Sequence, residues 1–363
     1  MRLTPTLKNI LSGDCPRLSS KLIRAFLTIL AAVYSVVISI RNLLYDKGLL
    51  KTHRLGVPVI CVGNLTVGGT GKTPMVLWLG RFFLERNITP AILTRGYKST
   101  YDQTNDEILL LKQTLDVPII VDSDRVRGGA TALQTHKPQV LIMDDGFSHR
   151  RLHRDLDLVL IDAANPFGYN HLLPRGLLRE PRPNLARAHV AILTRTDLIE
   201  PNKLEKLQNQ VAQLLNKQEL TDKLIIPACH APTALIDING TNKVLDQLSG
   251  KNVLAFCGIG NPDAFVTTLQ SLGAKVVTQH AFDDHHHYTD VDIKFIRDLS
   301  TQNQYDMIVT TEKDWVKLSQ IPMIKELTSL HRLNIEIAIT AGQQKFEDRL
   351  SRLCPKNQNE SKI

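Results

Sequence analysis

A glycine-rich loop is the feature that most constrains how this chain can fold. Residues 63–74 read GNLTVGGTGKTP, and they follow the short apolar run PVICVG at 58–63. An apolar run of this length that leads into a glycine loop is typical of a buried strand. The next residues, 75–87, have the apolar spacing of a helix. The order of strand, loop and helix therefore predicts a βα unit built around these glycines.

The loop matches part of the P-loop pattern GxxxxGK[ST]. Gly71, Lys72 and Thr73 fit its end, whereas Thr66 stands where its first glycine would fall. In a P-loop, backbone N–H groups surround phosphate oxygens, the lysine reaches them and the hydroxyl binds Mg²⁺. A glycine-rich turn with an incidental lysine is the alternative. The residues expected to contact a nucleotide are Thr66, Val67, Gly68, Gly69, Thr70, Gly71, Lys72 and Thr73.

A second phosphate-site element is expected in VLIMDDGF at 140–147, where two acids follow four apolar residues. P-loop proteins commonly use an Asp at a strand end to hold the metal ion. Asp144 or Asp145, together with Thr73, is therefore predicted to lie at Mg²⁺. Solvated turn residues are the alternative for this acidic pair.

Strand and helix patterns alternate along the rest of the chain. Strands are predicted at 91–97, 117–122, 139–145, 156–162 and 189–197, with helical or loop stretches between most of them. A further α/β series begins at 252–260 and ends near 334–340. This alternation is typical of a mostly parallel sheet covered on both faces. The predicted fold is α/β, with a P-loop NTPase-like domain and a smaller C-terminal α/β domain.

Five parts of the chain are predicted from these patterns. They are a basic and apolar segment at 1–54, a P-loop core at 55–222, an extended linker at 223–245, a C-terminal α/β domain at 246–350 and a polar tail at 351–363.

Positive charge is concentrated near the N-terminus. Residues 1–54 hold nine Lys or Arg and two Asp, a net charge of +7, whereas the whole chain has +8. The rest of the chain is therefore nearly neutral, which argues against a nucleic-acid partner. The five cysteines are scattered without CxxC spacing, so neither a disulfide framework nor a zinc ribbon is indicated.

The basic residues surround the uncharged run AFLTILAAVYSVVISI at 25–40. Sixteen helical residues span about 24 Å, less than the roughly 30 Å of a bilayer core. A stripe of small and polar residues is expected on one helical face; its members are Arg24, Thr28, Ala31, Ser35, Ser39 and Asn42. The segment is predicted to associate with a membrane containing anionic lipid, by lying in it or spanning it. A buried core helix is the alternative.

Five motifs occur in an order that resembles the tetraacyldisaccharide 4'-kinase family of lipid A synthesis. They are VGNLTVGGTGKTP, DDGFSHRRLHRDLDLVLID, LLPRGLLREP, FDDHHHYT and VTTEKDWVKL, in a match spanning about residues 20 to 345. The resemblance implies a kinase that uses ATP and Mg²⁺. The implied acceptor is the 4'-hydroxyl of a lipid disaccharide 1-phosphate at the cytoplasmic face of the bacterial inner membrane. An N-terminal membrane anchor fits such a substrate.

The resemblance also implies a catalytic Asp–His pair. Its Asp lies in a Gly-Asp-Glu-Pro segment of the family, which reads NDEIL here, so Asp106 is the match although the Gly and Pro are missing. Its His corresponds to His285, with His286 and His287 as rivals. An Asp can fix the tautomer of a His that accepts a proton from a sugar hydroxyl.

The REP segment matches a family segment beside the ATP phosphates. Arg179 would stabilise charge on the transferred phosphoryl group and Glu180 would help to hold Mg²⁺. An exposed ion pair is the alternative. Further arginines could contact lipid phosphate or form a solvated basic face; they are Arg125, Arg127, Arg150, Arg151 and Arg154.

Two other functions remain open from the sequence. TRTD at 194–197 faintly resembles the base-reading motif of GTPases, so a P-loop GTPase or ATPase is one alternative. A membrane-bound nucleotide-sensing module is the other, and it would place Asp106 and His285 far apart. The kinase interpretation expects the two residues to face each other across one cleft between the domains.

Overall fold

The computed structural model describes residues 11, 17–96, 106–215, 222–303 and 305–354. These residues form two compact units. The larger unit contains residues 11, 17–96, 115–215, 222–229 and 337–354, and the smaller unit contains 106–114, 230–303 and 305–336. Residues 106–114 thus pack with the smaller unit, although they were predicted to belong to the P-loop core at 55–222.

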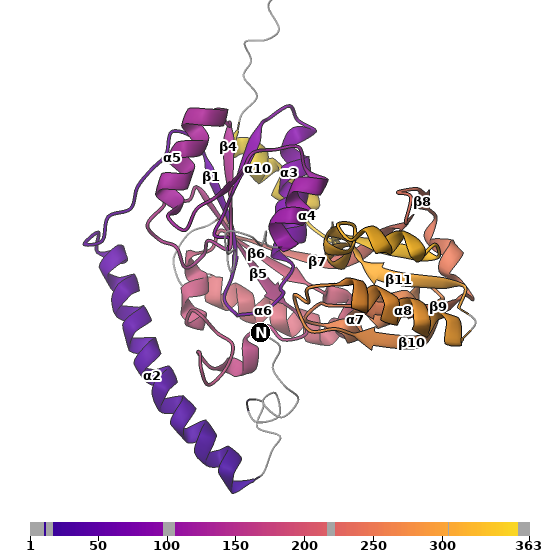
Figure 1. Cartoon of the computed structure of the whole chain (residues 1–363). Coiled ribbons are helices and arrows are strands. Elements are labelled where there is room, and N and C mark those ends of the chain that lie inside the picture. The colour runs from indigo at the N-terminus through magenta and orange to yellow at the C-terminus, as the bar shows by residue number, and fades with distance from the viewer. Residues whose placement is uncertain (1–10, 12–16, 97–105, 216–221, 304, 355–363) are drawn as a thin grey trace, which may run out of the picture. The chain divides into compact units, whose positions relative to one another are not determined.

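The element order alternates as the sequence predicts, and the α/β fold class is confirmed (Figure 1). The helices are α2 (Leu18–Asp46), α3 (Lys72–Leu84), α4 (Asp106–Thr114), α5 (Arg125–His136), α6 (Pro201–Leu215), α7 (Pro262–Ser271), α8 (Asp290–Gln302), α9 (Glu312–Leu318) and α10 (Gln343–Leu353). The 3₁₀ turns are η1 (Gly168–Asn170), η2 (Arg182–Arg187), η3 (Thr196–Leu198), η4 (Leu245–Leu248) and η5 (Pro322–Glu326).

The strands are β1 (Val59–Asn64), β2 (Pro90–Thr94), β3 (Ile119–Val121), β4 (Val140–Asp144), β5 (Leu156–Asp162), β6 (Val190–Thr194), β7 (Leu224–Asp237), β8 (Asn242–Lys243), β9 (Asn252–Cys257), β10 (Lys275–Ala281), β11 (Met307–Thr311) and β12 (Leu330–Ile339). Within residues 223–245, predicted to be an extended linker, the chain forms β7 and then turns into β8.

Parallel pairing organises the sheet of the larger unit. Its described strands lie in the order β7-β6-β5-β1-β4-β2-β3, and each neighbouring pair is parallel. β1, β2, β4 and β6 are buried along their whole length, as expected for strands covered on both faces. In Figure 1, α5 lies on one side of β1 and β4, and α3 lies on the other.

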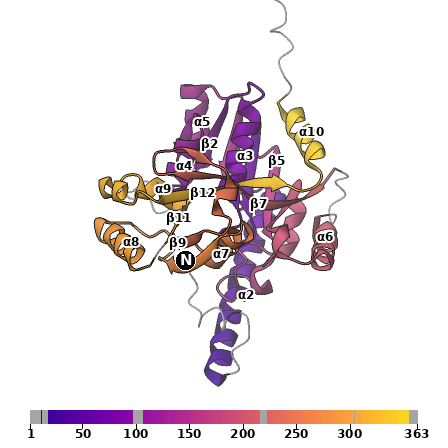
Figure 2. The same cartoon turned by 90° about the vertical axis from the view of Figure 1, so that its right-hand side faces the viewer.

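Aromatic contacts hold the C-terminal helix of the larger unit against α3. Trp78 of α3 stacks on Phe346 of α10 with ring centroids 5.4 Å apart. Arg86, just after α3, forms an ion pair of 2.8 Å with Glu347. Figure 2 shows α10 beside α3. These contacts bring residues 343–353 back onto the unit that holds the glycine loop.

The smaller unit has its own parallel strands and two apolar clusters. The strand order is β10-β9-β11-β12, and β8 pairs with β7 in antiparallel fashion. Successive side chains of β9 point to opposite faces. Val253 therefore packs in the cluster that contains Phe265 of α7, whereas Leu254 packs in the cluster that contains Ile293 of α8.

The N-terminal helix α2 belongs to the larger unit and is almost twice as long as its uncharged run. By length and composition alone it could cross a membrane, and only 11% of its most apolar 18-residue window is buried. This small buried share argues against a core helix. Large apolar residues lie exposed along it; they are Leu18, Leu22, Ile23, Phe26, Ile29, Leu30, Val33, Val36, Val37, Ile40 and Leu43.

One stripe of α2 is buried, and it differs from the predicted stripe. Ala31 and Asn42 of the predicted stripe are buried, but Ser39 is exposed while its neighbour Ile38 is buried. An aliphatic side chain gains more than a hydroxyl from leaving water, which favours this rotation of the helix. Tyr34 lies on the same stripe, and its hydroxyl donates to the carbonyl oxygen of Arg179 at 3.0 Å.

Candidate functional site

The glycine loop joins the buried strand β1 to α3, as predicted. Gly71 adopts a left-handed φ of +91° at the N-cap of α3, and Gly68 has φ +122°. A side chain is rarely tolerated at such φ values. A Cβ atom added to Gly68 or Gly69 would have open space around it. The backbone of this loop is therefore accessible to a ligand.

Two later segments of the larger unit support the loop. The Thr194 hydroxyl donates to the carbonyl oxygen of Thr70 at 3.0 Å. Arg195 donates to the carbonyl oxygen of Gly69 at 2.8 Å and also pairs with Asp162. The TRTD segment, which faintly resembles a base-reading motif, thus contacts the loop backbone through its first two residues.

The start of the loop forms backbone hydrogen bonds with the segment that carries Arg179. Val67 donates its backbone N–H to the carbonyl oxygen of Leu177 at 2.8 Å, and Arg179 donates its own to Leu65 at 2.7 Å. Thr66 forms a bridge with Leu178. This pairing takes up the Val67 N–H group, and it places the REP segment beside the glycine loop.

Close packing brings the acidic pair to the end of β1. A Cβ atom at Gly63 would lie 2.5 Å from Cβ of Phe147, so glycine is required where the DDGF segment meets β1. Asp144 lies opposite Val62 in the parallel register of β1 and β4 and is buried. Asp145 follows with a left-handed φ of +51°.

Asp145 contacts two other predicted site residues, Arg179 and Lys72. Arg179 donates to both of its carboxylate oxygens, at 2.6 and 2.9 Å, and Lys72 lies 3.7 Å away. Burial alone would raise the pKa of Asp145, but the hydrogen bonds from Arg179 and the charge of Lys72 hold it well below its usual range. Arg179 also donates to the side-chain oxygen of Asn64, the last residue of β1. Lys72, Asp145 and Arg179 therefore form one ionised cluster at the loop.

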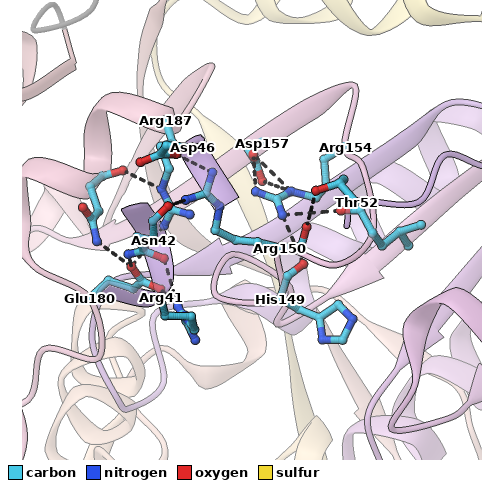
Figure 3. A network of polar contacts seen from close by, with 12 residues as sticks. Arg41, Asn42, Asp46, Thr52, His149, Arg150, Arg154, Asp157, Glu180 and Arg187 are labelled. Carbon is cyan, nitrogen blue, oxygen red and sulfur yellow. Dashed lines mark hydrogen bonds and ion pairs between the residues drawn. The ribbon is translucent and has the colours of Figure 1, made fainter. Parts of the chain in front are cut away.

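Glu180 is completely buried and is surrounded by donors (Figure 3). Arg41 and Asn42 of α2 donate to it at 2.7 and 3.0 Å, and Asn184 and Arg187 of η2 donate at 2.6 and 3.1 Å. Burial would raise its pKa, but the charge of Arg187 and the other donors lower it. These contacts make Glu180 an anchor for α2.

The five further arginines are engaged within the larger unit. Arg127, Arg150, Arg151 and Arg154 pair with Asp122, Asp46, Asp124 and Asp157, respectively. Arg125 is buried and donates to the carbonyl oxygen of Asp122 at 2.9 Å. Figure 3 shows the pair of Arg150 with Asp46 at the end of α2.

A hollow of about 340 Å³ lies beside α2 in the larger unit. Its lining residues are Thr28, Ala31, Ala32, Asn170, His171, Leu172, Leu178, Pro181, Arg182 and Pro183. The hollow is thus bordered by α2 on one side and by the segments around η1 and η2 on the other.

The smaller unit holds the second predicted constellation. Nδ1 of His285 lies 3.0 Å from Oδ2 of Asp106, the first residue of α4. His285 has a left-handed φ of +64°, an unusual backbone conformation for a non-glycine residue. Burial would raise the pKa of Asp106, but the hydrogen bond with His285 and the charge of Lys317 lower it to about 2. The pair forms inside this unit, whereas its members were predicted to lie in different domains.

The neighbouring histidines point elsewhere. Nε2 of His286 lies 3.3 Å from the carboxylate of Asp292, and its ring stacks on Phe282. His287 is exposed. Among the three adjacent histidines, the geometry singles out His285 as the partner of Asp106.

Sequence reasoning missed three residues that support these sites: Asn64, Arg195 and Lys317. All three lie in motifs found in the sequence, namely VGNLTVGGTGKTP, TRTD and VTTEKDWVKL, but a motif alone does not show what its residues contact. Lys317 lies 211 positions from Asp106, and its Nζ atom is 3.0 Å from Oδ2 of Asp106.

Known proteins resemble this chain along most of its length. A family model described as tetraacyldisaccharide-1-P 4'-kinase matches residues 23–355. The tetraacyldisaccharide 4'-kinase of Syntrophus aciditrophicus is 37% identical, with 92% of this chain and 93% of the relative covered. That of Halothermothrix orenii is 33% identical, with 93% and 95% covered.

A solved structure agrees with these relatives. The crystal structure of the "apo" form of LpxK from Aquifex aeolicus in complex with ATP has a TM-score of 0.71 and 31% identity to this chain. It covers 92% of this chain and 99% of its own. From the family model and the identity of its relatives, this chain belongs to the tetraacyldisaccharide-1-P 4'-kinase family.

Proposed function

We propose that this protein is a lipid-sugar kinase that transfers the γ-phosphoryl group of ATP to the 4'-hydroxyl of a tetraacyldisaccharide 1-phosphate. Family membership supports this activity. The observation that carries it is the 3.0 Å contact between His285 and Asp106, in a chain that also has a P-loop with Lys72 and Thr73. A proton acceptor and a phosphate-binding loop are the two parts that phosphoryl transfer to a sugar hydroxyl requires.

The glycine loop is the proposed nucleotide site, since its open backbone at Gly68 and Gly69 fits a phosphate chain. Backbone groups between Gly68 and Thr73 would contact the phosphates, and Lys72 would reach the transferred group. Thr66 and Val67 would shape the start of the loop, because they pair with residues 177–178. Arg179 would stabilise charge on the phosphoryl group, so its bonds to Asp145 would then be shared or exchanged.

Mg²⁺ is the proposed metal, and its ligands would be drawn from Thr73, Asp144 and Asp145. Within the described ranges, no group of three or more His, Cys, Asp or Glu side chains could by itself hold a metal ion. Mg²⁺ usually takes only one or two carboxylates together with nucleotide phosphates, so this donor set fits. When bound, the ion would neutralise charge on the phosphates. Glu180 was predicted as a further Mg²⁺ ligand. We propose instead that it anchors α2, because its two carboxylate oxygens form ion pairs with Arg41 and Arg187.

The Asp106–His285 pair is proposed to accept the proton of the acceptor hydroxyl. Asp106 is ionised at neutral pH, so Nδ1–H of His285 donates to its carboxylate and Nε2 is left as the basic atom. The hydroxyl proton would then move to Nε2 as the oxygen attacks the γ-phosphorus, and the bond between this phosphorus and ADP would break, so that ADP leaves. Asp106 would hold the ring and stabilise the positive charge that forms on it.

The membrane surface is the proposed place of action. The exposed apolar side chains of α2 would lie in the bilayer, and the basic N-terminal residues would attract anionic lipid. The hollow beside α2 would offer apolar surface to acyl chains. Because ATP is made available in the cytoplasm, we place the protein at the cytoplasmic face of the bacterial inner membrane.

Transfer of labelled γ-phosphate from ATP to purified tetraacyldisaccharide 1-phosphate tests this function. We expect label in the lipid only when ATP, Mg²⁺, enzyme and acceptor are all present. Release of inorganic phosphate at the same rate without lipid, or a strict preference for GTP, would support a P-loop ATPase or GTPase instead. Nucleotide binding with no turnover under any lipid condition would support a sensing module.

A further inference from the structure

The motif VTTEKDWVKL has no role in the proposed chemistry, yet its lysine lies at the Asp–His pair. Lys317 of α9 is 9% exposed, and its ammonium group donates to Oδ2 of Asp106 at 3.0 Å. It also donates to the carbonyl oxygen of His286 at 2.9 Å. One side chain thus contacts the carboxylate of the pair and the backbone next to its histidine.

The first turn of α9 fixes where this lysine lies. Thr311 caps the helix by accepting from the backbone N–H of Asp314 at 3.1 Å. Asp314 is completely buried and accepts from the hydroxyl of Thr311 at 2.6 Å and from the backbone N–H of Gly258 at 3.0 Å. Its other oxygen lies 3.7 Å from Nζ of Lys317, one turn along the helix. Asp314 therefore connects α9 to the loop after β9.

The same loop holds the backbone of His285. The backbone N–H of His285 donates to the carbonyl oxygen of Gly258 at 3.2 Å. Gly258 is thus bonded to Asp314 through its N–H and to His285 through its C=O. Asp314 is therefore linked to both members of the catalytic pair. Its contact with Lys317 leads to Asp106, and its hydrogen bond with Gly258 leads to His285.

We propose that Lys317 is a positioning residue for the kinase reaction: it orients the carboxylate of Asp106 toward His285 and sets the charge around the pair. This inference rests on the proposed function, because it assigns a role within that chemistry. Lys317 need not contact substrate, since Asp106, the carbonyl group of His286 and Asp314 already surround its ammonium group.

Charge makes this role measurable. A buried ammonium group next to a carboxylate opposes protonation of the Asp–His pair, since it repels the imidazolium that would form. Other ionisable groups near the pair are Lys313, whose charge acts on Asp106, and Asp284, which lies 3.9 Å from Nε2 of His285 and 3.7 Å from Lys313. Neither contacts Asp106 as Lys317 does, so removing the charge of Lys317 should favour the protonated pair.

The test compares Lys317→Met and Lys317→Arg with the full-length wild-type enzyme. Lys317→Met removes the charge and keeps most of the apolar stem, and we expect kcat to fall about ten- to hundredfold while KM for ATP changes little. The acidic limb of the plot of kcat/KM against pH should shift to higher pH by about one unit. Lys317→Arg should restore that limb toward its wild-type position, because it restores the charge. Lys294→Met is the matched control, since this lysine of α8 is exposed.

A second measurement does not depend on activity. Titration of the imidazole of His285 by NMR, assigned with His285→Gln, should show the same upward movement in Lys317→Met. If Lys317→Met fails to fold, Lys317→Gln supplies the neutral side chain with hydrogen-bonding capacity. Profiles and titrations that coincide with the wild type in a folded neutral variant would overturn the role of Lys317. Wild-type enzyme that fails to phosphorylate the lipid would overturn the proposed function, while the titration would still report on Lys317.

Discussion

Arg41 and Glu180 form an ion pair of 2.7 Å that joins the N-terminal helix to the residue directly after Arg179. Tyr34 reinforces the connection by donating to the carbonyl oxygen of Arg179 at 3.0 Å. The helix that is proposed to contact the membrane is therefore bonded to the segment that is proposed to contact phosphate. Movement of α2 would displace the backbone that carries Arg179.

Replacement of Glu180 by Ala should destabilise the protein. The side chain of Arg187 is only 13% exposed and would lose its acceptor, whereas that of Arg41 is about one-third exposed and can be solvated. We therefore expect the free energy of unfolding to fall by about 3 kcal/mol, the lower end for breaking a buried pair. Denaturant unfolding of both proteins in detergent measures this. Unchanged stability together with lost Mg²⁺-dependent nucleotide binding would instead favour Glu180 as a metal ligand.

Lys72→Ala should lower kcat for lipid phosphorylation by orders of magnitude. The ammonium group lies 3.7 Å from Asp145 at the end of the glycine loop, where it can reach a transferred phosphoryl group. Initial rates with labelled ATP measure the loss, and Lys206→Ala on the surface of α6 serves as the control. A Lys72→Ala enzyme with near-normal rates would refute the P-loop assignment.

The losses of activity caused by replacing Asp106 and by replacing His285 should not be additive. The two side chains share one hydrogen bond, so removing either one disables the pair. Asp106→Ala, His285→Ala and the double variant should reach similarly low kcat values while each still binds ATP. A double variant whose loss equals the product of the two single losses would show that the residues act separately. His286→Ala should retain activity, because His286 faces Asp292 and Phe282.

The sequence predicted the parts of the fold that depend on local pattern. The order of β1, loop and α3 follows from an apolar run, glycines and helical spacing, and the strands of both units lie where apolar runs occur. His285 was chosen over its neighbours by resemblance, and its contact with Asp106 fits that choice. Long-range contacts were not predictable in this way. Glu180 was assigned to Mg²⁺ by resemblance, and its contacts with Arg41 and Asn42 of α2 could not be inferred from the residues near it in sequence.

The stripe on α2 shows the same limit at the level of one helix. Spacing of three and four predicted which small and polar residues share a face, and Ala31 and Asn42 do lie on the buried side. The surface against which α2 packs decides which of the neighbouring residues are buried. Ile38 is buried and Ser39 is exposed because packing rewards the aliphatic side chain. A pattern within one element cannot contain that information.

Arg195→Ala should weaken ATP binding more than catalysis. Arg195 donates to the carbonyl oxygen of Gly69 at 2.8 Å and pairs with Asp162, so it holds the loop in the form that would receive phosphate. Loss of one charged hydrogen bond, about 1.5–3 kcal/mol, predicts a rise in KM for ATP of about tenfold or more. Arg297→Ala in α8 is the control, because this arginine pairs with the exposed Asp298 and Glu326. An unchanged KM would show that the loop keeps its shape without this contact.

Substitutions on the exposed face of α2 should release the protein from membranes without disturbing the nucleotide site. Phe26, Val33 and Val37 are 61%, 59% and 57% exposed, and the triple change to Ser leaves Tyr34, Arg41 and Asn42 in place. This is a sharper test than removing residues 1–41, which would also delete Arg41 from its pair with Glu180. Loss of three apolar side chains from a bilayer should cost about 4 kcal/mol or more, roughly a thousandfold in partition.

The measurement separates apolar from electrostatic attachment. Membranes from cells that make either protein are pelleted and washed at 1 M salt, where the Debye length is about 3 Å and surface attraction to anionic lipid is screened. The wild-type protein should stay in the pellet until detergent is added, whereas the triple variant should appear in the wash with unchanged affinity for ATP. The control variant carries Ser at Val244, Val277 and Val291, three exposed residues of the smaller unit, and should pellet like the wild type. A triple α2 variant that resists the salt wash as fully as the wild type would show that this face of the helix is not the anchor.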